Sequence, residues 1–220
     1  MKATFIILAC AALCGHALAV DPKAGTWYHT GTSVENGWFE DWGAEHVQVS
    51  GQEVKLGSDG APLSWQVSGS PGGGSVSVMK DALVKHSGLA SARVEVAETL
   101  DGAALAQHFS VEPSTSYLVR VWVRGEDIVP ATGKPGAGIF LWANSGPAGD
   151  AVWGNQKSMH KQPAKFSGTF DWQLVEFPVE TSPEAARLKI VLQLRDASGT
   201  AWFDDVEVVK SDTLTPVKSY

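Results

Sequence analysis

Apolar and polar residues alternate in a series of short runs along the second half of the chain. Because successive side chains of a β-strand point to opposite faces, each run predicts a strand with one face turned towards a core. In 117–124, the odd-numbered positions form the core face, and Arg120, Trp122 and Arg124 lie opposite. The other runs are 90–96, 105–111, 139–144 and 187–195; in the last, Leu188, Ile190, Leu192 and Leu194 face inward, while Lys189, Val191, Gln193 and Arg195 face outward.

Glycine and proline separate these runs, and only 182–186 has a briefly helical pattern. Many short strands without a helical stretch predict an all-β chain, an antiparallel β-sandwich of the jelly-roll kind. Near the start, the bend at Asn36-Gly37 precedes a first strand that ends at Phe39 and Glu40. No linker or internal repeat divides the chain, so we expect one domain.

The last strong strand, 199–208, joins apolar residues to two adjacent carboxylates, Asp204 and Asp205. Alternation predicts that these two side chains point opposite ways, with Val206 and Val208 on the side of Asp204. Aspartate is depleted in strands and costly to bury unless its charge is satisfied. Either the strand ends in solvent at this point, or a cation accompanies at least one carboxylate.

Residues 1–19 have the pattern of a secretory signal: Lys2, an apolar run, and the small residues of Ala17-Leu18-Ala19. We therefore expect a secreted, periplasmic or extracellular protein, cleaved after Ala19, with no later run long enough to span a bilayer. Cleavage removes both cysteines, which leaves packing and hydrogen bonds, with or without a metal, to hold the domain. The alternative is a lipoprotein anchored through Cys10.

The formal net charge is −7, and the 17 Lys and Arg residues form no basic tract. Such a chain lacks the long-range attraction that binding to nucleic acid or to an anionic membrane requires. Nine tryptophans stand against three tyrosines, and tryptophan offers a broad apolar face with one polar edge. This composition favours neutral partners.

Several motifs fall in the order typical of one known group of domains, and the chain resembles carbohydrate-binding modules of families 4 and 9. These are jelly rolls of the galactose-binding-domain-like class. The resemblance spans 33–209, after a lead-in segment at 20–32 and before a tail at 210–220. The motifs that carry it are Asn36-Gly37-Trp38-Phe39-Glu40, His86-Ser87-Gly88-Leu89-Ala90-Ser91, Pro113 with 117–124, Phe170-Asp171-Trp172, and Trp202-Phe203-Asp204-Asp205-Val206.

In such modules a structural calcium joins the first strand to the last. The resemblance implies Glu40 and Asp204 as side-chain ligands, Asp205 as a weaker candidate, and carbonyls of 86–88 as further ligands. Calcium takes several oxygen ligands and tolerates flexible geometry. The alternative is that these carboxylates are solvated strand ends.

The resemblance implies non-catalytic binding of a poly- or oligosaccharide along one sheet or its rim, through aromatic stacking and polar side chains. We expect the site on the face opposite the valine-rich core side. Trp153, in a glycine-rich loop, is the best exposed candidate, whereas Trp38, Trp172 and Trp202 are expected to pack in the core or at edges. The candidate ligand-binding residues are Trp153, Trp142, Trp122, Arg120, Arg124, Asn144, Gln193 and Arg195.

Two other functions remain open. A glycoside hydrolase usually needs two placed carboxylates, and a lyase needs residues that do not cluster in sequence. The histidines have no metal-ligand spacing, and no GxSxG motif is present. The other alternative is an extracellular or envelope protein-interaction module on the same fold. Association with glycoside hydrolases or with the cell envelope is compatible with each of these functions.

Overall fold

The computed structural model describes residues 33–44, 53–70, 74–147 and 166–211, together with the short strands at 19–20, 27–28, 47–48 and 159–161. These residues form strands and turns, and no α-helix occurs among them. The expected all-β class is therefore confirmed. None of the described residues belongs to a helix with the length and apolarity needed to cross a membrane.

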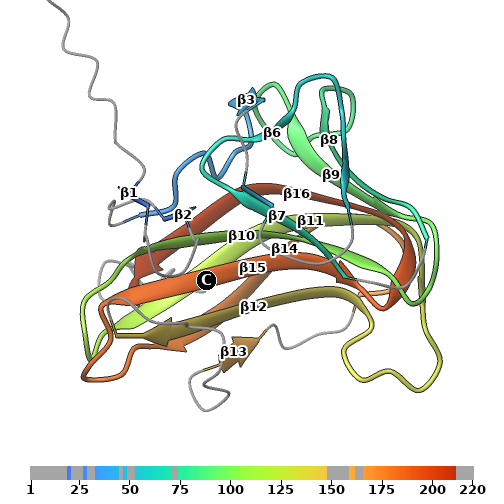
Figure 1. Ribbon diagram of the computed structural model, residues 1–220. Helices are drawn as coiled ribbons and strands as arrows, with labels where there is room; N and C mark the ends of the chain where they lie inside the picture. Colours follow the sequence, from blue (N-terminus) through green and yellow to red (C-terminus); the bar gives the residue numbers. More distant parts are fainter. Residues whose placement is uncertain are drawn as a thin grey trace, which may run out of the picture.

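Two sheets of six strands each stack face to face (Figure 1). Sheet 1 has the order β13 (Met159–Lys161), β12 (Gly138–Gly146), β15 (Arg187–Arg195), β10 (Gly102–Ser110), β7 (Gln66–Ser70) and β4 (Val47–Gln48). Sheet 2 has the order β14 (Gly168–Glu180), β11 (Ser116–Pro130), β16 (Ala197–Lys210), β9 (Ser91–Val96), β8 (Val76–Asp81) and β5 (Lys55–Leu56). Two-stranded pairs are formed by β1 (Ala19–Val20) with β2 (Trp27–Tyr28), and by β3 (Trp42–Gly43) with β6 (Ala61–Pro62).

The pairing is antiparallel except where the short strands β4 and β5 join β7 and β8. From β9 onward, successive long strands belong to alternate sheets, so the chain repeatedly crosses the sandwich. This repeated crossing between two antiparallel sheets is the jelly-roll arrangement that the alternation predicts, and the fold class is confirmed.

The core lies between the sheets and consists of the faces that alternation indicates. Val119, Val121 and Val123 of β11 are each at most 1% exposed, and Leu188 to Leu194 of β15 supply the facing layer. Each sheet therefore has an outer face directed away from this core. Any surface for binding has to be sought on the two outer faces or at the ends of the sandwich.

The outer face of sheet 1 is not uniformly open, and the expectation that Lys189 and Val191 face solvent is wrong. Lys189 is 0% exposed and Val191 is 3% exposed. In register with Lys189, His108 of β10 and Asn144 of β12 are buried as well. Alternation shows which side of a strand a residue occupies but not whether further chain covers that side.

Residues 36–39 form a turn closed by Phe39 N–H and the Asn36 carbonyl, and 40–41 belong to no strand, so the expected first strand ending at Phe39 and Glu40 is wrong. Asn36 and Phe39 both have left-handed backbone conformations, with φ of 48° and 52°. The Asn36 side-chain amide donates to the carbonyl oxygens of Asp41 and Leu63 at 2.8 and 3.0 Å. Asparagine tolerates this conformation and bonds locally to backbone, so the segment bends around Asn36 and β3 starts only at Trp42.

A β-bulge in β16 changes the faces expected after Asp204. Arg120 of β11 pairs with Glu207 of β16, and Trp122 pairs with Asp204. Between these two pairs, one residue of β11 lies opposite two residues of β16, so β16 contains one extra residue. Asp205 has φ of 46° at this bulge. Asp204 therefore shares the outer face with Trp122, while Val208 pairs with Val119 on the core face. The prediction that Val206 and Val208 continue the side of Asp204 is wrong because the bulge shifts the alternation, and Val206 belongs to the buried core. Asp204 and Asp205 do not point opposite ways either, since both bond to His86 and Ser87.

Candidate functional site

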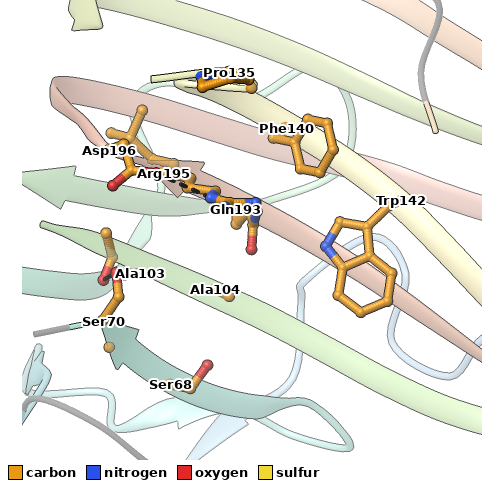
Figure 2. A pocket seen from close by; sticks show the side chains of 14 residues that line it. Ser68, Ser70, Ala103, Ala104, Pro135, Phe140, Trp142, Gln193, Arg195 and Asp196 are labelled. Atoms are coloured by element: carbon orange, nitrogen blue, oxygen red, sulfur yellow. Dashed lines mark hydrogen bonds and ion pairs between the residues drawn. The ribbon is translucent and has the colours of Figure 1, made fainter. Parts of the chain in front are cut away.

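The outer face of sheet 1 contains a groove of about 510 Å³ at the end where β10 begins and β15 ends. Its walls come from β7, β10, β15 and β12 and from the turns beside them. Figure 2 shows Phe140 and Trp142 at one side of the groove and Ser68 and Ser70 at the other. The lining residues that present side chains are Ser68, Ser70, Ala104, Pro135, Phe140, Trp142, Gln193, Arg195 and Asp196.

Strand register explains why this part of the sheet is hollow. One row across the four strands runs from Ser68 through Ala104 and Gln193 to Phe140. Small side chains thus occupy β7 and β10, while larger ones occupy β15 and β12. In the next row Gly102 allows close packing, since a Cβ on it would lie 2.7 Å from both the Leu194 carbonyl oxygen and Ser70 Oγ.

The wall on β12 is aromatic. Phe140 and Trp142 are two residues apart on one strand, so their rings project from the same face, and both are half-buried. Beneath Trp142, Lys189 Nζ lies 5.5 Å from the ring centroid. Burial lowers the pKa of Lys189 to about 6. The lysine amine below the wall therefore carries little positive charge at neutral pH. The wall offers two apolar ring faces to a ligand.

Polar groups line the other parts of the groove. Gln193 lies between the aromatic wall and the small residues of β10. Arg195 Nε donates to Asp196 Oδ2 at 3.1 Å, and its guanidinium lies 5.9 Å from the Phe140 ring centroid. Hydroxyl, amide and guanidinium groups are thus placed beside flat apolar surface.

The structure separates the predicted ligand-binding residues into two groups. Trp142, Gln193 and Arg195 line the groove. Asn144 occupies the same face farther along β12 but is buried. Trp153 lies outside the described residues. The remaining three, Arg120, Trp122 and Arg124, belong to β11 of sheet 2.

The expectation that β11 and β12 contribute to one surface is therefore wrong. The two strands are consecutive in the chain, but the connection between them crosses from sheet 2 to sheet 1. Sequence reasoning also missed Ser68, Ser70 and Ala104 as part of the site. The available signal was their small size, which becomes informative only once they are known to lie opposite Phe140.

On the outer face of sheet 2, polar and aromatic groups contact one another. Arg120 donates to Glu176 and Glu207 at 2.8 and 3.0 Å. The His86 ring stacks on Trp122 with centroids 3.7 Å apart and planes 15° apart. These contacts engage the arginine and cover one face of the indole that we expected to bind a ligand. Together with Trp38, both residues still line a hollow of about 180 Å³.

The other tryptophans on this face only partly follow expectation. Trp202 is 4% exposed beneath the Arg124 guanidinium, which is 4.7 Å from its ring centroid. Trp172 is half-buried, with its ring edge-on to His86 at 5.8 Å. Trp38 is 55% exposed, so its expected place in the core or at a packed edge is wrong. The left-handed turn that buries Phe39 turns Trp38 outward.

The carboxylates expected to bind calcium meet the same loop, residues 86–89. Asp204 Oδ2 accepts from the backbone N–H groups of His86 and Ser87 at 2.9 and 3.2 Å. Glu40 Oε1 accepts from the N–H of Leu89 at 2.6 Å. Burial raises the pKa of Asp204 to about 6 despite these hydrogen bonds. The loop thus connects the turn after Asn36 with the last strand.

Two observations bear on whether this region fits a calcium ion. Glu40 Oε2 is buried and has no hydrogen-bond partner, so it is an acceptor free to ligate. Asp205, by contrast, has Oδ2 2.6 Å from His86 Nδ1 and Oδ1 2.8 Å from Ser87 Oγ. Throughout the described chain, no three His, Cys, Asp or Glu side chains gather as a metal site. Glu40 thus offers one oxygen without a partner, whereas both oxygens of Asp204 already accept main-chain N–H groups, Oδ1 from Asp205 at 2.8 Å. A calcium ion here would need main-chain oxygens to supply its other ligands.

Fold and groove define a class: a jelly-roll β-sandwich with an aromatic-walled groove on one sheet. Among known proteins, no family model and no curated sequence matches the chain. A similar solved structure is the enzymatically active domain of tailspike protein 4 of bacteriophage CBA120, with 13% identity and a TM-score of 0.54. That similarity covers 81% of this chain and 21% of the tailspike chain, so the two share a fold over about a fifth of the tailspike.

Carbohydrate-binding modules are also among the similar structures. TmCBM61 in complex with β-1,4-galactotriose has 20% identity and a TM-score of 0.45, covering 68% of this chain and 90% of that module. The CBM22-1 xylan-binding domain of Paenibacillus barcinonensis Xyn10C has 15% identity and a TM-score of 0.42, covering 71% and 88%. None of these similarities singles out families 4 and 9.

Proposed function

We propose that the protein binds a neutral poly- or oligosaccharide in the groove of sheet 1 and does no chemistry on it. The observation that carries the proposal is the pair of half-buried rings, Phe140 and Trp142, beside a floor of small residues. A pyranose ring has an apolar C–H face, which packs on an aromatic face, and a rim of hydroxyls, which needs hydrogen-bonding partners.

The polar lining suits the hydroxyl rim. Gln193 presents an amide that both donates and accepts, and Ser68 presents a hydroxyl across the floor formed by Ala104. Sugar hydroxyls also donate and accept, so groups of this kind match them without requiring a charge on the ligand. Its volume of about 510 Å³ lies in the range of ligand pockets and accommodates a short saccharide.

The lining favours binding over hydrolysis. Asp196 provides the one carboxylate among the described residues that line the groove, and it accepts a hydrogen bond from Arg195. Glycoside hydrolysis usually uses two carboxyl groups on either side of the bond that is cleaved. The groove described here supplies the surface for holding a saccharide but not that pair.

The proposal includes calcium and export. Calcium held by Glu40 and Asp204 would compensate a buried carboxylate oxygen without a partner and a buried negative charge. It would fix the 86–89 loop between the two ends of the domain. Export of the chain, with cleavage after Ala19, is checked by sequencing the N-terminus of protein recovered outside the cytoplasm. We expect it to begin at Val20.

Titration with soluble neutral glucans, galactans and xylans tests the binding function, with tryptophan fluorescence and calorimetry as readouts and a reducing-end assay in parallel. We expect saturable binding to at least one glycan and no release of reducing ends. Trp142→Ala should weaken binding by about 10- to 100-fold, typical of a central aromatic contact. Trp122→Ala is the matched control on sheet 2 and should leave affinity unchanged. Equal losses in both variants, or released reducing ends, would overturn the proposal.

A further inference from the structure

Asp101 is a buried carboxylate that neither the groove nor the Glu40–Asp204 region uses. It is 0% exposed, and neither Oδ1 nor Oδ2 has a hydrogen-bond partner. An ionised carboxylate without a counter-charge or donors is expensive to bury. A buried polar group of this kind requires an explanation, and a bound ion is one of the few available.

Asp101 lies where two connections between the sheets meet. One runs from β7 of sheet 1 to β8 of sheet 2, and the other runs from β9 of sheet 2 to β10 of sheet 1. Gly74 in the first connection approaches the second so closely that a Cβ on it would overlap Asp101 Oδ2 and Glu98 Cγ. The N–H of Asp101 donates to the Glu98 carbonyl at 3.1 Å, which closes the turn between these two acids.

We propose that Asp101 and Glu98 hold a divalent cation of the calcium class between these two connections. The side-chain donors in this cluster are carboxylate oxygens, which suit calcium rather than a thiolate- or imidazole-preferring metal. Glu98 is exposed and gives the ion access from solvent, while buried Asp101 supplies the inner ligand. Main-chain oxygens of the described residues beside these two acids would have to complete the shell.

This cation has a structural consequence for the groove. Ser70 ends β7 and Gly102 begins β10, and both line the groove directly beside the two connections. Ser70 Oγ donates to the Gly102 carbonyl at 3.2 Å. An ion at Asp101 would hold this end of the groove wall in place. The site is separate from the one proposed at Glu40 and Asp204 and does not depend on what the groove binds.

Calcium titration of chelator-treated full-length protein by calorimetry, with melting curves in parallel, tests the proposal. Asp101→Asn keeps the side-chain shape and removes the charge. We expect it to weaken calcium binding at this site by at least about 10-fold, because loss of even an outer partner of a metal commonly has that effect. It should also abolish the rise in melting temperature that calcium produces through this site. Without calcium, Asp101→Asn should melt at or above the wild-type temperature.

Glu98→Gln and Glu40→Gln are the matched variants. Glu98→Gln, at an exposed position, should fold normally and weaken the same binding event, whereas Glu40→Gln should leave it intact. Unaltered calcium binding in both Asp101→Asn and Glu98→Gln would overturn the proposal, as would wild-type protein that binds no calcium. Loss of all calcium binding in Glu40→Gln alone would assign the ion to the other site. If Asp101→Asn does not fold, the result for Glu98→Gln decides.

Discussion

The outer faces of sheet 1 and sheet 2 both carry tryptophan, arginine and acidic residues, but the hollow beside aromatic rings is about 510 Å³ on sheet 1 and about 180 Å³ on sheet 2. On sheet 2, Arg120 bonds to two glutamates, and His86 stacks on Trp122. On sheet 1, Phe140 and Trp142 stand beside a hollow of about 510 Å³. A similar set of residue types therefore pairs mostly with itself on sheet 2, where a smaller hollow is left, and leaves a larger space for a ligand on sheet 1.

The difference comes from what lies across the strands. On sheet 1 the partners of Gln193 and Phe140 in the same row are Ala104 and Ser68, which are too small to reach them. On sheet 2 the cross-strand partners of Arg120 are the long acids Glu176 and Glu207. Side-chain length in register, rather than aromatic content, thus explains why the hollow on sheet 1 is larger than the one on sheet 2.

Filling the hollow on sheet 1 tests this difference between the sheets most directly. Ala104→Phe places a ring on the floor between Ser68 and Gln193, so we expect saccharide affinity to fall by at least about 30-fold, or about 2 kcal/mol. The measurement is calorimetric titration with the best-binding glycan. Ser77→Phe, on the outer face of sheet 2, is the control and should bind like wild type. Full affinity in Ala104→Phe would place the ligand elsewhere.

The second test concerns Lys189, whose buried amine lies below the aromatic wall. Burial lowers the pKa of Lys189 from 10.5 to about 6, so the folded state holds this proton less tightly than the unfolded state. The Lys189 contribution to stability therefore falls as pH decreases from 10.5 to about 6 and is constant below that. Lys189→Met should raise stability at pH 7 by on the order of 3 kcal/mol, with the gain shrinking towards pH 10. Denaturant unfolding measures it, and a gain independent of pH would contradict the assignment.

Alternation alone predicted much of this molecule. It identified the core faces of β9, β11, β12 and β15, because a period of two is preserved wherever strands are regular. It failed where the backbone departs from that period. The bulge at Asp205 moves Val208 to the core, and the left-handed turn at Asn36 and Phe39 exposes Trp38.

The site was harder to predict than the fold because it depends on pairing between distant strands. β11 and β12 are adjacent in sequence, and a sequence pattern does not show that the chain crosses to the other sheet between them. Ser68 and Phe140 share a row only through β10 and β15. Trp142, Gln193 and Arg195 were identified individually, but the hollow among them follows from register alone.

Asp204 on sheet 2 provides a counterpart to Lys189 with a smaller expected effect. Burial raises its pKa from 3.8 to about 6, so the folded state holds the proton more tightly, and the Asp204 contribution to stability is lost as pH rises from about 4 to 6. In chelator, the stability of wild type relative to Asp204→Asn should therefore fall by about 2 kcal/mol between pH 4 and pH 7. Unfolding curves at several pH values measure this difference.

Calcium should reverse that trend if Asp204 is a ligand, because an ion favours the ionised carboxylate. With saturating calcium, wild type should gain stability relative to Asp204→Asn as pH rises to 7, and its melting temperature should exceed that in chelator. Glu40→Gln should reduce this calcium effect in the same way. Identical pH profiles with calcium and with chelator would show that no calcium binds in this region. Asp204 would then serve only to hold the 86–89 loop through its hydrogen bonds.

We expect the smallest effect on the outer face of sheet 2, where Arg120 pairs with neighbouring acids. Arg120→Ala breaks contacts to Glu176 and Glu207 that are about half exposed to solvent, and ion pairs of this kind typically contribute at most about 1 kcal/mol. We expect a melting temperature lowered by no more than a few degrees for a loss of that size, with saccharide affinity unchanged. Retained affinity would show that the arginine serves sheet 2 alone. A loss of binding comparable to that of Trp142→Ala would instead mean that the ligand reaches both faces, and the contrast between the two sheets would no longer hold.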